Sequence, residues 1–204
     1  MDKGLIIGVT GQARSGKDTF AEMLLEELFE TTRRKFIMMA YANELKLRVQ
    51  QDFDLSYAQL WGDDKEVEDK RYIKPDNTCW TAREIMQAYG QFFRTIDQLF
   101  WVNNLFKVIE DKEYKNVIIT DVRHPNEADA VKRYDGYIIK VTSNRVNKQT
   151  IHGSEHISET AMNNYANIDF NVDNSGSLDD LRAIAKQVVE FLITSEKLKR
   201  LEVL

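Results

Sequence analysis

Residues 4–19 read GLIIGVTGQARSGKDT, and this stretch decides the fold. The apolar run over residues 5–9 leads directly into the spacing Gly11-x-x-x-x-Gly16-Lys17, and an amphipathic helical pattern follows at once. This order of strand, glycine loop and helix is typical of a phosphate-binding loop, in which backbone N–H groups and a helix N-terminus surround phosphate oxygens. The sequence therefore predicts a nucleotide-phosphate site at the first turn between a strand and a helix.

Within this loop we expect Lys17 to reach the β- and γ-phosphates as a mobile point charge. The residues predicted to contact ATP here are Gly11, Ala13, Arg14, Ser15, Gly16, Lys17, Asp18 and Thr19. In the common pattern a Ser or Thr follows the lysine and its hydroxyl binds Mg²⁺, whereas this chain has Asp18 there and Thr19 one residue later. A carboxylate can bind Mg²⁺ directly or through water, so Asp18 is a predicted metal residue. Which of the two faces the metal stays open.

Length and composition predict one domain that has room for a small inserted subdomain, since the chain has 204 residues. Hydrophobic residues make up 43% of the chain and the formal net charge is −5, which argues against a nucleic-acid partner because such proteins present a basic surface. Cys79 is the only cysteine, so an intrachain disulfide is excluded. No apolar run is long enough to span a bilayer and we recognise no signal peptide, so we expect a cytoplasmic protein without a membrane partner.

The predicted core is a parallel sheet, because short apolar runs alternate with helical patterns and several runs are apolar throughout. The five predicted strands are Leu5–Thr10, Lys35–Ala40, Asn116–Thr120, Tyr137–Val141 and Ile168–Val172. The predicted helices follow Lys17, Thr81 and Asp97 and cover Asn126–Arg133 and Leu178–Thr194. This is an α/β fold with helices on both faces of a five-stranded sheet.

Residues 43–113 form a segment longer than a simple crossover, and we expect a helical subdomain there that could hold a second ligand. The helix after Thr81 begins with a capping box, Thr81-x-x-Glu84. Four of its residues share one face at helical spacing, namely Arg83, Gln87, Gly90 and Arg94. This face is either solvated or binds a ligand. A glycine within a helix costs about 1 kcal/mol relative to alanine, so Gly90 indicates close approach of a backbone or a ligand.

The third predicted strand leads into Asp121 and Arg123, and ligands in open α/β sheets bind at the carboxyl ends of strands. Asp121 is therefore expected to order Mg²⁺ or to act as a base, and we prefer this to an N-cap role because Asn126 suits that role for the next helix. Arg123 could hold a phosphate with its planar guanidinium, although a surface ion pair is the alternative.

Polar segments also come after the fourth and fifth strands. Residues 143–158 are expected to form a loop that could close over phosphates, with Arg145 as its best-placed cation, although an ordinary surface loop is nearly as good an interpretation. His152 and His156 lack the additional ligands of a zinc site. Asn174 and Gly176 belong to a turn that suits an N-cap, and their place after a strand makes them candidates for contacting the nucleotide base.

In combination these motifs resemble the phage-type deoxynucleoside monophosphate kinases over nearly the whole chain and in the same order. The matching segments are GQARSGKDT at 11–19, ANELK at 42–46, TAREIMQ at 81–87 with Gly90, FWV at 100–102, DVR at 121–123 with Asn126 and Glu127, HISE at 156–159, and Asn174 with GSL at 176–178. The ending Gly-Lys-Asp-Thr is itself part of the likeness.

The resemblance implies a three-layer P-loop NTPase fold and Mg²⁺-dependent transfer of the γ-phosphoryl group from ATP to a deoxynucleoside monophosphate. It implies an acceptor site in the helical subdomain, with Lys46, Arg83, Gln87 and Arg94 as its residues. The expected catalytic residues are Lys17, Arg14, Asp121, Arg123 and Arg145, with Asp18 and Asp121 on the metal side. A phage-encoded protein would act in the host cytoplasm, and a homodimer stays open.

Two alternatives remain for the sequence. Animal-type phosphomevalonate kinases share a similar Gly-Lys-Asp loop, so the acceptor could be another phosphorylated metabolite. The chain could also bind nucleotides without catalysis.

Overall fold

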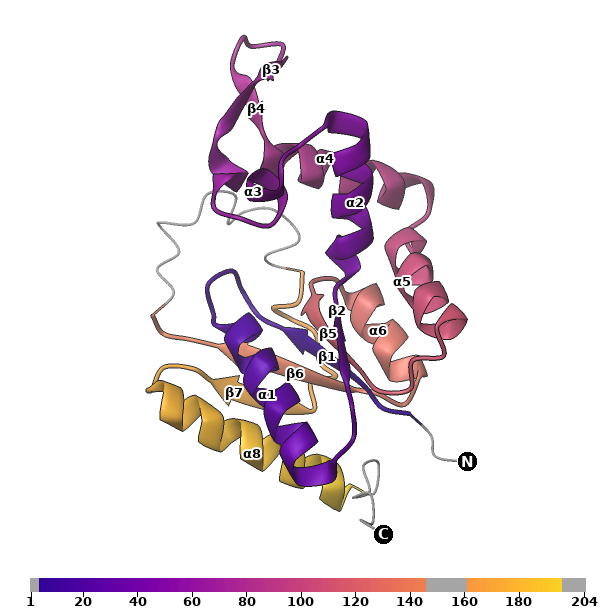
Figure 1. Cartoon of the computed structure of the whole chain (residues 1–204), viewed down its shortest axis with the longest axis vertical. Coiled ribbons are helices and arrows are strands. Elements are labelled where there is room, and N and C mark those ends of the chain that lie inside the picture. The colour runs from indigo at the N-terminus through magenta and orange to yellow at the C-terminus, as the bar shows by residue number, and fades with distance from the viewer. Residues whose placement is uncertain (1–3, 146–160, 196–204) are drawn as a thin grey trace. The chain divides into compact units, whose positions relative to one another are not determined.

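The computed structural model describes residues 4–145 and 161–195 (Figure 1). The chain divides into two compact units. Unit 1 consists of Met1–Ala40 together with Val108–Leu204, and unit 2 is Tyr41–Lys107.

Unit 1 is built on a five-stranded parallel sheet in the order β2-β5-β1-β6-β7. Its strands are β1 (Ile6–Thr10), β2 (Ile37–Met39), β5 (Val117–Val122), β6 (Tyr137–Thr142) and β7 (Phe170–Asp173). The five predicted strands are therefore confirmed, with ends shifted by a few residues. Every residue of β1 is buried, because this strand lies between β5 and β6 and both of its faces are covered.

Helices cover both faces of this sheet, which confirms the expected three-layer α/β fold. On one face α1 (Lys17–Thr32) and α8 (Leu178–Thr194) pack together, and Figure 1 shows them side by side. Their apolar residues share a core with β1, as Phe20, Leu24 and Val188 are fully buried against Ile7 and Val9. Helix α6 (Pro125–Arg133) contacts β1 and β6 from the other side.

The start of α6 differs from our prediction, in which Asn126 was the N-cap. The helix begins at Pro125, so His124 is the N-cap and Asn126 lies inside the first turn. Proline suits the first helical position because its fixed φ is helical and its missing N–H would have no partner there. The Glu127 carboxylate accepts hydrogen bonds from the backbone N–H groups of Arg123, at 2.8 Å, and His124, at 3.1 Å.

Unit 2 combines short helices with a β-hairpin. Its elements are α2 (Tyr41–Phe53), α3 (Tyr57–Leu60), the 3₁₀ turn η1 (Asp64–Glu66), β3 (Glu68–Ile73), β4 (Cys79–Thr81), α4 (Ala82–Ile96) and α5 (Phe100–Asp111), the last of which ends beyond the unit. We expected a helical subdomain over residues 43–113, and the structure differs at residues 68–81, where β3 and β4 pair antiparallel. Pro75 and Asn77 lie in the turn between them, and Asn77 has φ = 68°, which asparagine tolerates well.

The core of unit 2 explains the glycine within α4. A Cβ on Gly90 would lie 2.8 Å from the Cδ1 atom of Leu45, so the glycine lets α2 pack closely on α4. The apolar residues predicted for α4 belong to the hydrophobic core of unit 2, in which Ile85 is buried and Met86, Tyr89 and Phe93 are partly buried. The close neighbour of Gly90 is thus a side chain of α2, whereas we expected a backbone or a ligand. None of the described helices has the length and apolar character needed to cross a membrane.

Candidate functional site

The glycine loop joins β1 to α1 through a tight turn with two left-handed residues. Ser15 N–H donates to the carbonyl of Gln12 at 3.1 Å, which closes a tight turn. Arg14 and Gly16 flank Ser15 in the left-handed region, with φ = 63° and 81°. Gly16 is the N-cap of α1 and supplies no side-chain cap, so the first turn of this helix has no side-chain acceptor from its N-cap. Anions bind well at such a helix N-terminus.

Two polar side chains inside the loop also fit an anionic ligand. Ser15 is 1% exposed, and its Oγ atom has no hydrogen-bond partner within the described part of the chain. The Lys17 side chain is 10% exposed, and its Nζ atom lies 3.2 Å from both carboxylate oxygens of Asp18. A buried hydroxyl without a partner is costly, and a phosphate oxygen would satisfy it. The loop therefore fits a polyphosphate by its own geometry.

Two side chains that could serve as ligands for a metal ion lie on the outer side of this turn. The Asp18 side chain is 73% exposed, and Thr19 beside it is exposed as well. Across residues 4–145 and 161–195, no group of three or more His, Cys, Asp or Glu side chains forms a ready-made metal site. One or two carboxylates together with phosphate oxygens and water are what Mg²⁺ prefers. The residues present thus fit a Mg²⁺ ion that arrives with a nucleotide.

Two further predicted residues lie near the end of β5, at the same edge of the sheet. Strand β5 runs through Val122, because Val122 pairs with Thr10, so Asp121 is its penultimate residue and is partly buried. Arg123 comes directly after the strand and is also partly buried. Since the strands are parallel, the ends of β1 and β5 lie on one side of the sheet, the side from which the glycine loop also leaves β1. Asp121 and Arg123 thus lie at the edge of the sheet from which the glycine loop leaves β1.

The segments that follow β6 and β7 are joined by hydrogen bonds. Asn174 donates its backbone N–H to Thr142 at 2.7 Å and accepts from the Ser143 hydroxyl at 2.9 Å. The Arg145 guanidinium donates to the carbonyl oxygens of Ser175, at 3.1 Å, and Gly176. The predicted residues Arg145, Asn174 and Gly176 therefore lie together. Of the predicted loop 143–158, the described residues are 143–145, and His152 and His156 lie outside the described residues.

The predicted acceptor residues all belong to unit 2, and each is partly buried. Arg83 forms an ion pair with Glu66. The Nζ atom of Lys46 lies 5.5 Å from the centre of the Trp61 ring, a cation–π distance. Arg83, Gln87 and Arg94 share one face of α4, as their spacing predicted.

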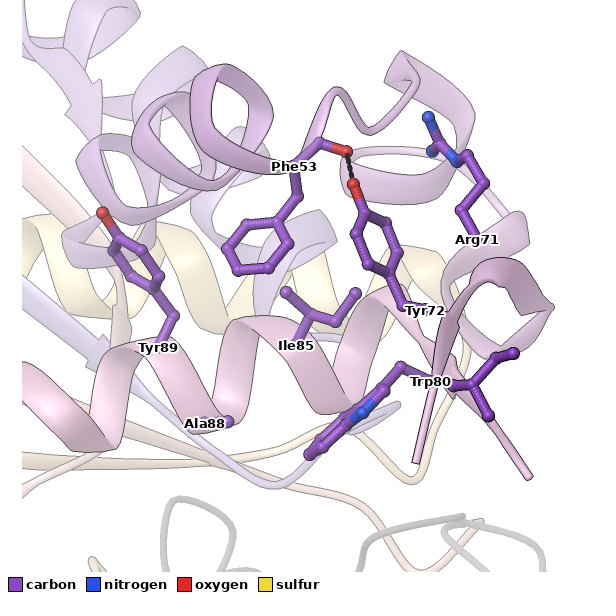
Figure 2. Close-up of a pocket in the computed structure, with 8 residues that line it drawn as sticks. Phe53, Arg71, Tyr72, Trp80, Ile85, Ala88 and Tyr89 are labelled. Atoms are coloured by element: carbon purple, nitrogen blue, oxygen red, sulfur yellow. Dashed lines mark hydrogen bonds between the residues drawn. The ribbon is translucent and has the colours of Figure 1, made fainter. Parts of the chain in front are cut away.

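Figure 2 shows an aromatic pocket of about 430 Å³ in this unit. By helical spacing its α4 residues, Ile85, Ala88 and Tyr89, lie on the face opposite to Arg83, Gln87 and Arg94. Its lining residues come from α2, the hairpin and α4, and they are Phe53, Arg71, Tyr72, Ile73, Trp80, Ile85, Ala88 and Tyr89. The rings of Phe53 and Tyr72 meet edge to face, with centroids 5.5 Å apart. The Tyr72 hydroxyl donates to the Phe53 carbonyl at 2.6 Å, the dashed line in Figure 2. None of the predicted acceptor residues lines this pocket.

The polar groups of the pocket are already engaged. Arg71 donates from Nε and Nη2 to the carboxylate of Asp69, at 2.9 and 2.7 Å, and these bonds hold the pKa of Asp69 well below its usual range. The Tyr89 hydroxyl donates to Asp52 at 2.7 Å, and burial together with this bond raises the pKa of Tyr89 to about 12. The pocket therefore offers mainly ring faces and methyl groups near neutral pH.

The sequence interpretation missed this pocket because its walls come from a hairpin that was expected to be helical. A signal was present: Pro75-Asp76-Asn77 is a turn sequence between the aromatic residues Tyr72 and Trp80. It also missed that Asn174 contacts the glycine loop itself, since its Nδ2 atom donates to the Ser15 carbonyl at 2.9 Å.

Comparison with known proteins gives a family and a relative. A family model described as deoxynucleotide monophosphate kinase matches residues 35–184. An Acanthamoeba polyphaga mimivirus protein, provisionally named a deoxynucleotide monophosphate kinase, is 30% identical over 166 residues, which cover 74% of this chain and 80% of the relative.

Solved structures with similar chain traces are remote in sequence. A dephospho-CoA kinase from Campylobacter jejuni is 11% identical with a TM-score of 0.47, and the match covers 92% of this chain and 96% of that one. A shikimate kinase from Acinetobacter baumannii, solved with shikimate, is 12% identical with a TM-score of 0.44 and 97% coverage of both chains.

Proposed function

Since the chain belongs to the deoxynucleotide monophosphate kinase family, a family of phosphotransferases, we propose that it transfers the γ-phosphoryl group of ATP to a deoxynucleoside monophosphate and releases ADP and the deoxynucleoside diphosphate. The observation that carries the proposal is the glycine-bounded start of α1, which brings together the buried Lys17 and the buried Ser15 hydroxyl, for which residues 4–145 and 161–195 offer no hydrogen-bond partner. The phosphate loop precedes the residues that the family model matches, so it supports the proposal independently.

On the donor side, the loop of residues 11–19 binds the ATP phosphates through backbone amides and Lys17. Asp18 and Asp121 would hold Mg²⁺, directly or through water, and a bound ion would supply charge neutralisation for the phosphates. The mainly exposed Asp18 side chain supports the first assignment, and the position of Asp121 at the carboxyl end of β5 supports the second.

Three arginines are proposed to stabilise the transferring phosphoryl group. Arg14 is exposed on the loop itself, Arg123 follows β5, and Arg145 follows β6. Phosphoryl transfer depends mainly on positioning and charge neutralisation, and one well-placed arginine can contribute about 10³-fold or more in rate. The acceptor phosphate is ionised at neutral pH, so the reaction needs no strong general base.

On the acceptor side, we place the phosphate of the monophosphate on Arg83 and Arg94 and its base near Gln87, with Lys46 as a further contact. Their shared face on α4 and their partial burial support this assignment. The aromatic pocket on the opposite face of α4 is the competing position for the base, because aromatic rings stack on nucleobases.

The test is a kinase assay with ATP and Mg²⁺ across the deoxyribonucleoside and ribonucleoside monophosphates, with a phosphorylated non-nucleotide metabolite as a further acceptor. Release of ADP is coupled to a spectrophotometric readout, and the diphosphate product is identified by mass. We expect turnover that depends on a deoxynucleoside monophosphate. ADP release that is independent of the acceptor, or turnover with the non-nucleotide acceptor alone, would overturn the proposal.

A further inference from the structure

Asn174 contacts the glycine loop from a distant part of the chain. It is the first residue after β7, and its side-chain Nδ2 donates to the backbone carbonyl of Ser15, 159 residues earlier, at 2.9 Å. Its own backbone is fixed on both sides, because its N–H donates to Thr142 at 2.7 Å and its carbonyl accepts from the Ser143 hydroxyl at 2.9 Å. The side chain therefore reaches the loop from a fixed base at the ends of β6 and β7.

The bonded carbonyl belongs to the peptide between Ser15 and Gly16. A peptide unit is planar and trans here, so its C=O and N–H point in opposite directions. When Asn174 holds the Ser15 carbonyl toward itself, the N–H of Gly16 must point away from Asn174. That N–H is one of the amides that a phosphate-binding loop directs at its ligand.

The loop needs such a support because its backbone is unusual at this point. Arg14 and Gly16 are both left-handed, and this conformation is unfavourable for a residue with a side chain. A Cβ on Gly16 would lie 2.1 Å from Nδ2 of Asn174, so the amide group occupies the space that any other residue at position 16 would fill. The glycine and the asparagine therefore depend on each other.

We propose that Asn174 is a positioning residue that orients the Ser15–Gly16 peptide, and hence the Gly16 N–H, for binding nucleotide phosphates. This inference rests on the proposed function of the loop. It differs from a base-contacting role in its consequence: a positioning residue affects every ligand that carries the polyphosphate, whereas a base contact affects adenine nucleotides selectively.

The experiment compares Asn174→Ala with Asn171→Ala, which removes the same type of side chain from an exposed position of β7. Calorimetry with Mg²⁺ measures the affinity of each variant for ADP, GDP and inorganic tripolyphosphate. We expect Asn174→Ala to weaken all three by a similar factor of about ten, the size of one hydrogen bond, and Asn171→Ala to weaken none. In turnover assays the KM for ATP should rise while the KM for the acceptor stays constant.

A loss confined to ADP, or no loss, would overturn the inference. If Asn174→Ala does not fold, Asn174→Leu keeps a side chain of similar size and removes the donor without adding a charge. If the wild-type protein binds none of the three ligands, the proposed function fails, and the inference is then tested on the ligand-free protein by NMR. The NMR resonances of the Ser15 carbonyl carbon and of the Gly16 amide should then shift in Asn174→Ala and stay unchanged in Asn171→Ala. Unmoved resonances would contradict the positioning role.

Discussion

The indole Nε1–H of Trp101 donates a hydrogen bond to the backbone carbonyl of Gly90 across 3.1 Å, inside the core of unit 2. This bond ties α5 to the glycine of α4, and Trp101 is only 2% exposed. We expect Trp101→Phe to lower the free energy of unfolding by about 1–2 kcal/mol, because the donor and part of the ring contacts are lost. Urea denaturation followed by circular dichroism measures the change.

The matched control is Trp61→Phe. Trp61 is partly buried and stacks on Tyr57, and phenylalanine keeps that stacking. We expect a smaller loss of stability for this variant. Equal losses for the two tryptophans would show that the bond to Gly90 contributes nothing specific.

Lys17→Ala should abolish phosphoryl transfer, with at least a 10³-fold fall in kcat/KM, because the variant lacks the charge that compensates the phosphates. Thermal unfolding of the variant should stay close to that of the wild type, since the Nζ atom pairs only with the exposed Asp18 in the described structure. Lys35→Ala, at an exposed position, is the control. Turnover near the wild-type rate would remove Lys17 from the site.

Arg83→Ala should raise the KM for the acceptor about tenfold or more and leave the KM for ATP nearly unchanged, because a guanidinium–phosphate contact is lost on the acceptor side alone. Steady-state kinetics with each substrate varied in turn gives both constants. Arg182→Ala removes an exposed arginine paired with Glu26 and should change neither constant.

A second variant decides between the two faces of α4. Ala88→Trp fills the aromatic pocket from an exposed position of the helix and removes no contact of Arg83 or Gln87. The acceptor KM should stay at the wild-type value. A selective rise in that constant would move the base of the acceptor into the pocket.

Asp121→Asn should shift the Mg²⁺ concentration at half-maximal activity upward several-fold, because an amide is a weaker ligand for this hard cation than a carboxylate. The activity is titrated with Mg²⁺ at a fixed saturating ATP concentration. Asp129→Asn, in an exposed position of α6, serves as the comparison. A superimposable metal titration for Asp121→Asn would place this carboxylate outside the metal's surroundings.

The hydrogen bonds from Arg71 to Asp69 predict how the free energy of unfolding depends on pH. Since they hold the pKa of Asp69 below its usual value, the native state binds a proton less readily than the unfolded chain. The stabilisation is therefore complete above about pH 4 and is lost as the pH falls from there toward the depressed native pKa. Urea midpoints between pH 7 and pH 3 should fall more steeply for the wild type than for Asp69→Asn.

At pH 7 the same variant should be less stable by about 1–2 kcal/mol, since Arg71 and Gln59 both donate to Asp69. Asp54→Asn is the control, because the Asp54 side chain is 99% exposed and solvent screens its pairing with Arg71. Parallel pH curves for the wild type and Asp69→Asn would show that the charge on Asp69 does not stabilise the native state.

The sheet of unit 1 could be predicted because its signals are local. The central strands begin with short apolar runs, such as Ile6-Ile7 in β1 and Val117-Ile118-Ile119 in β5, and the glycine loop marks the passage from the first strand to the first helix. Helix α8 was also predicted with its observed bounds, Leu178–Thr194, and the structure shows that Ser177 and Asp180 form a capping box at its start.

The features that the sequence interpretation missed have different causes. The hairpin of unit 2 is local and is marked by the turn sequence Pro75-Asp76-Asn77, but its short strands lack a clear alternation of apolar and polar residues and lie between helices. The N-cap of α6 is His124 because Pro125 occupies the first helical position and Glu127 accepts hydrogen bonds from the residues before it. Local sequence alone did not distinguish this arrangement from a cap at Asn126. The bond between Asn174 and Ser15 joins residues that no local pattern relates.

Strand β1 lies between β5 and β6, although unit 2 separates it from both along the chain. A protease that cleaved the hairpin turn would leave one fragment carrying β1, β2 and α1, and a second carrying β5, β6, β7 and α8. Neither fragment could complete the sheet by itself, because the central strand belongs to the first and its two neighbours to the second. The nicked halves should therefore stay associated in solution and, when expressed separately, reconstitute each other, with Ser15 and Asn174 rejoined across the break.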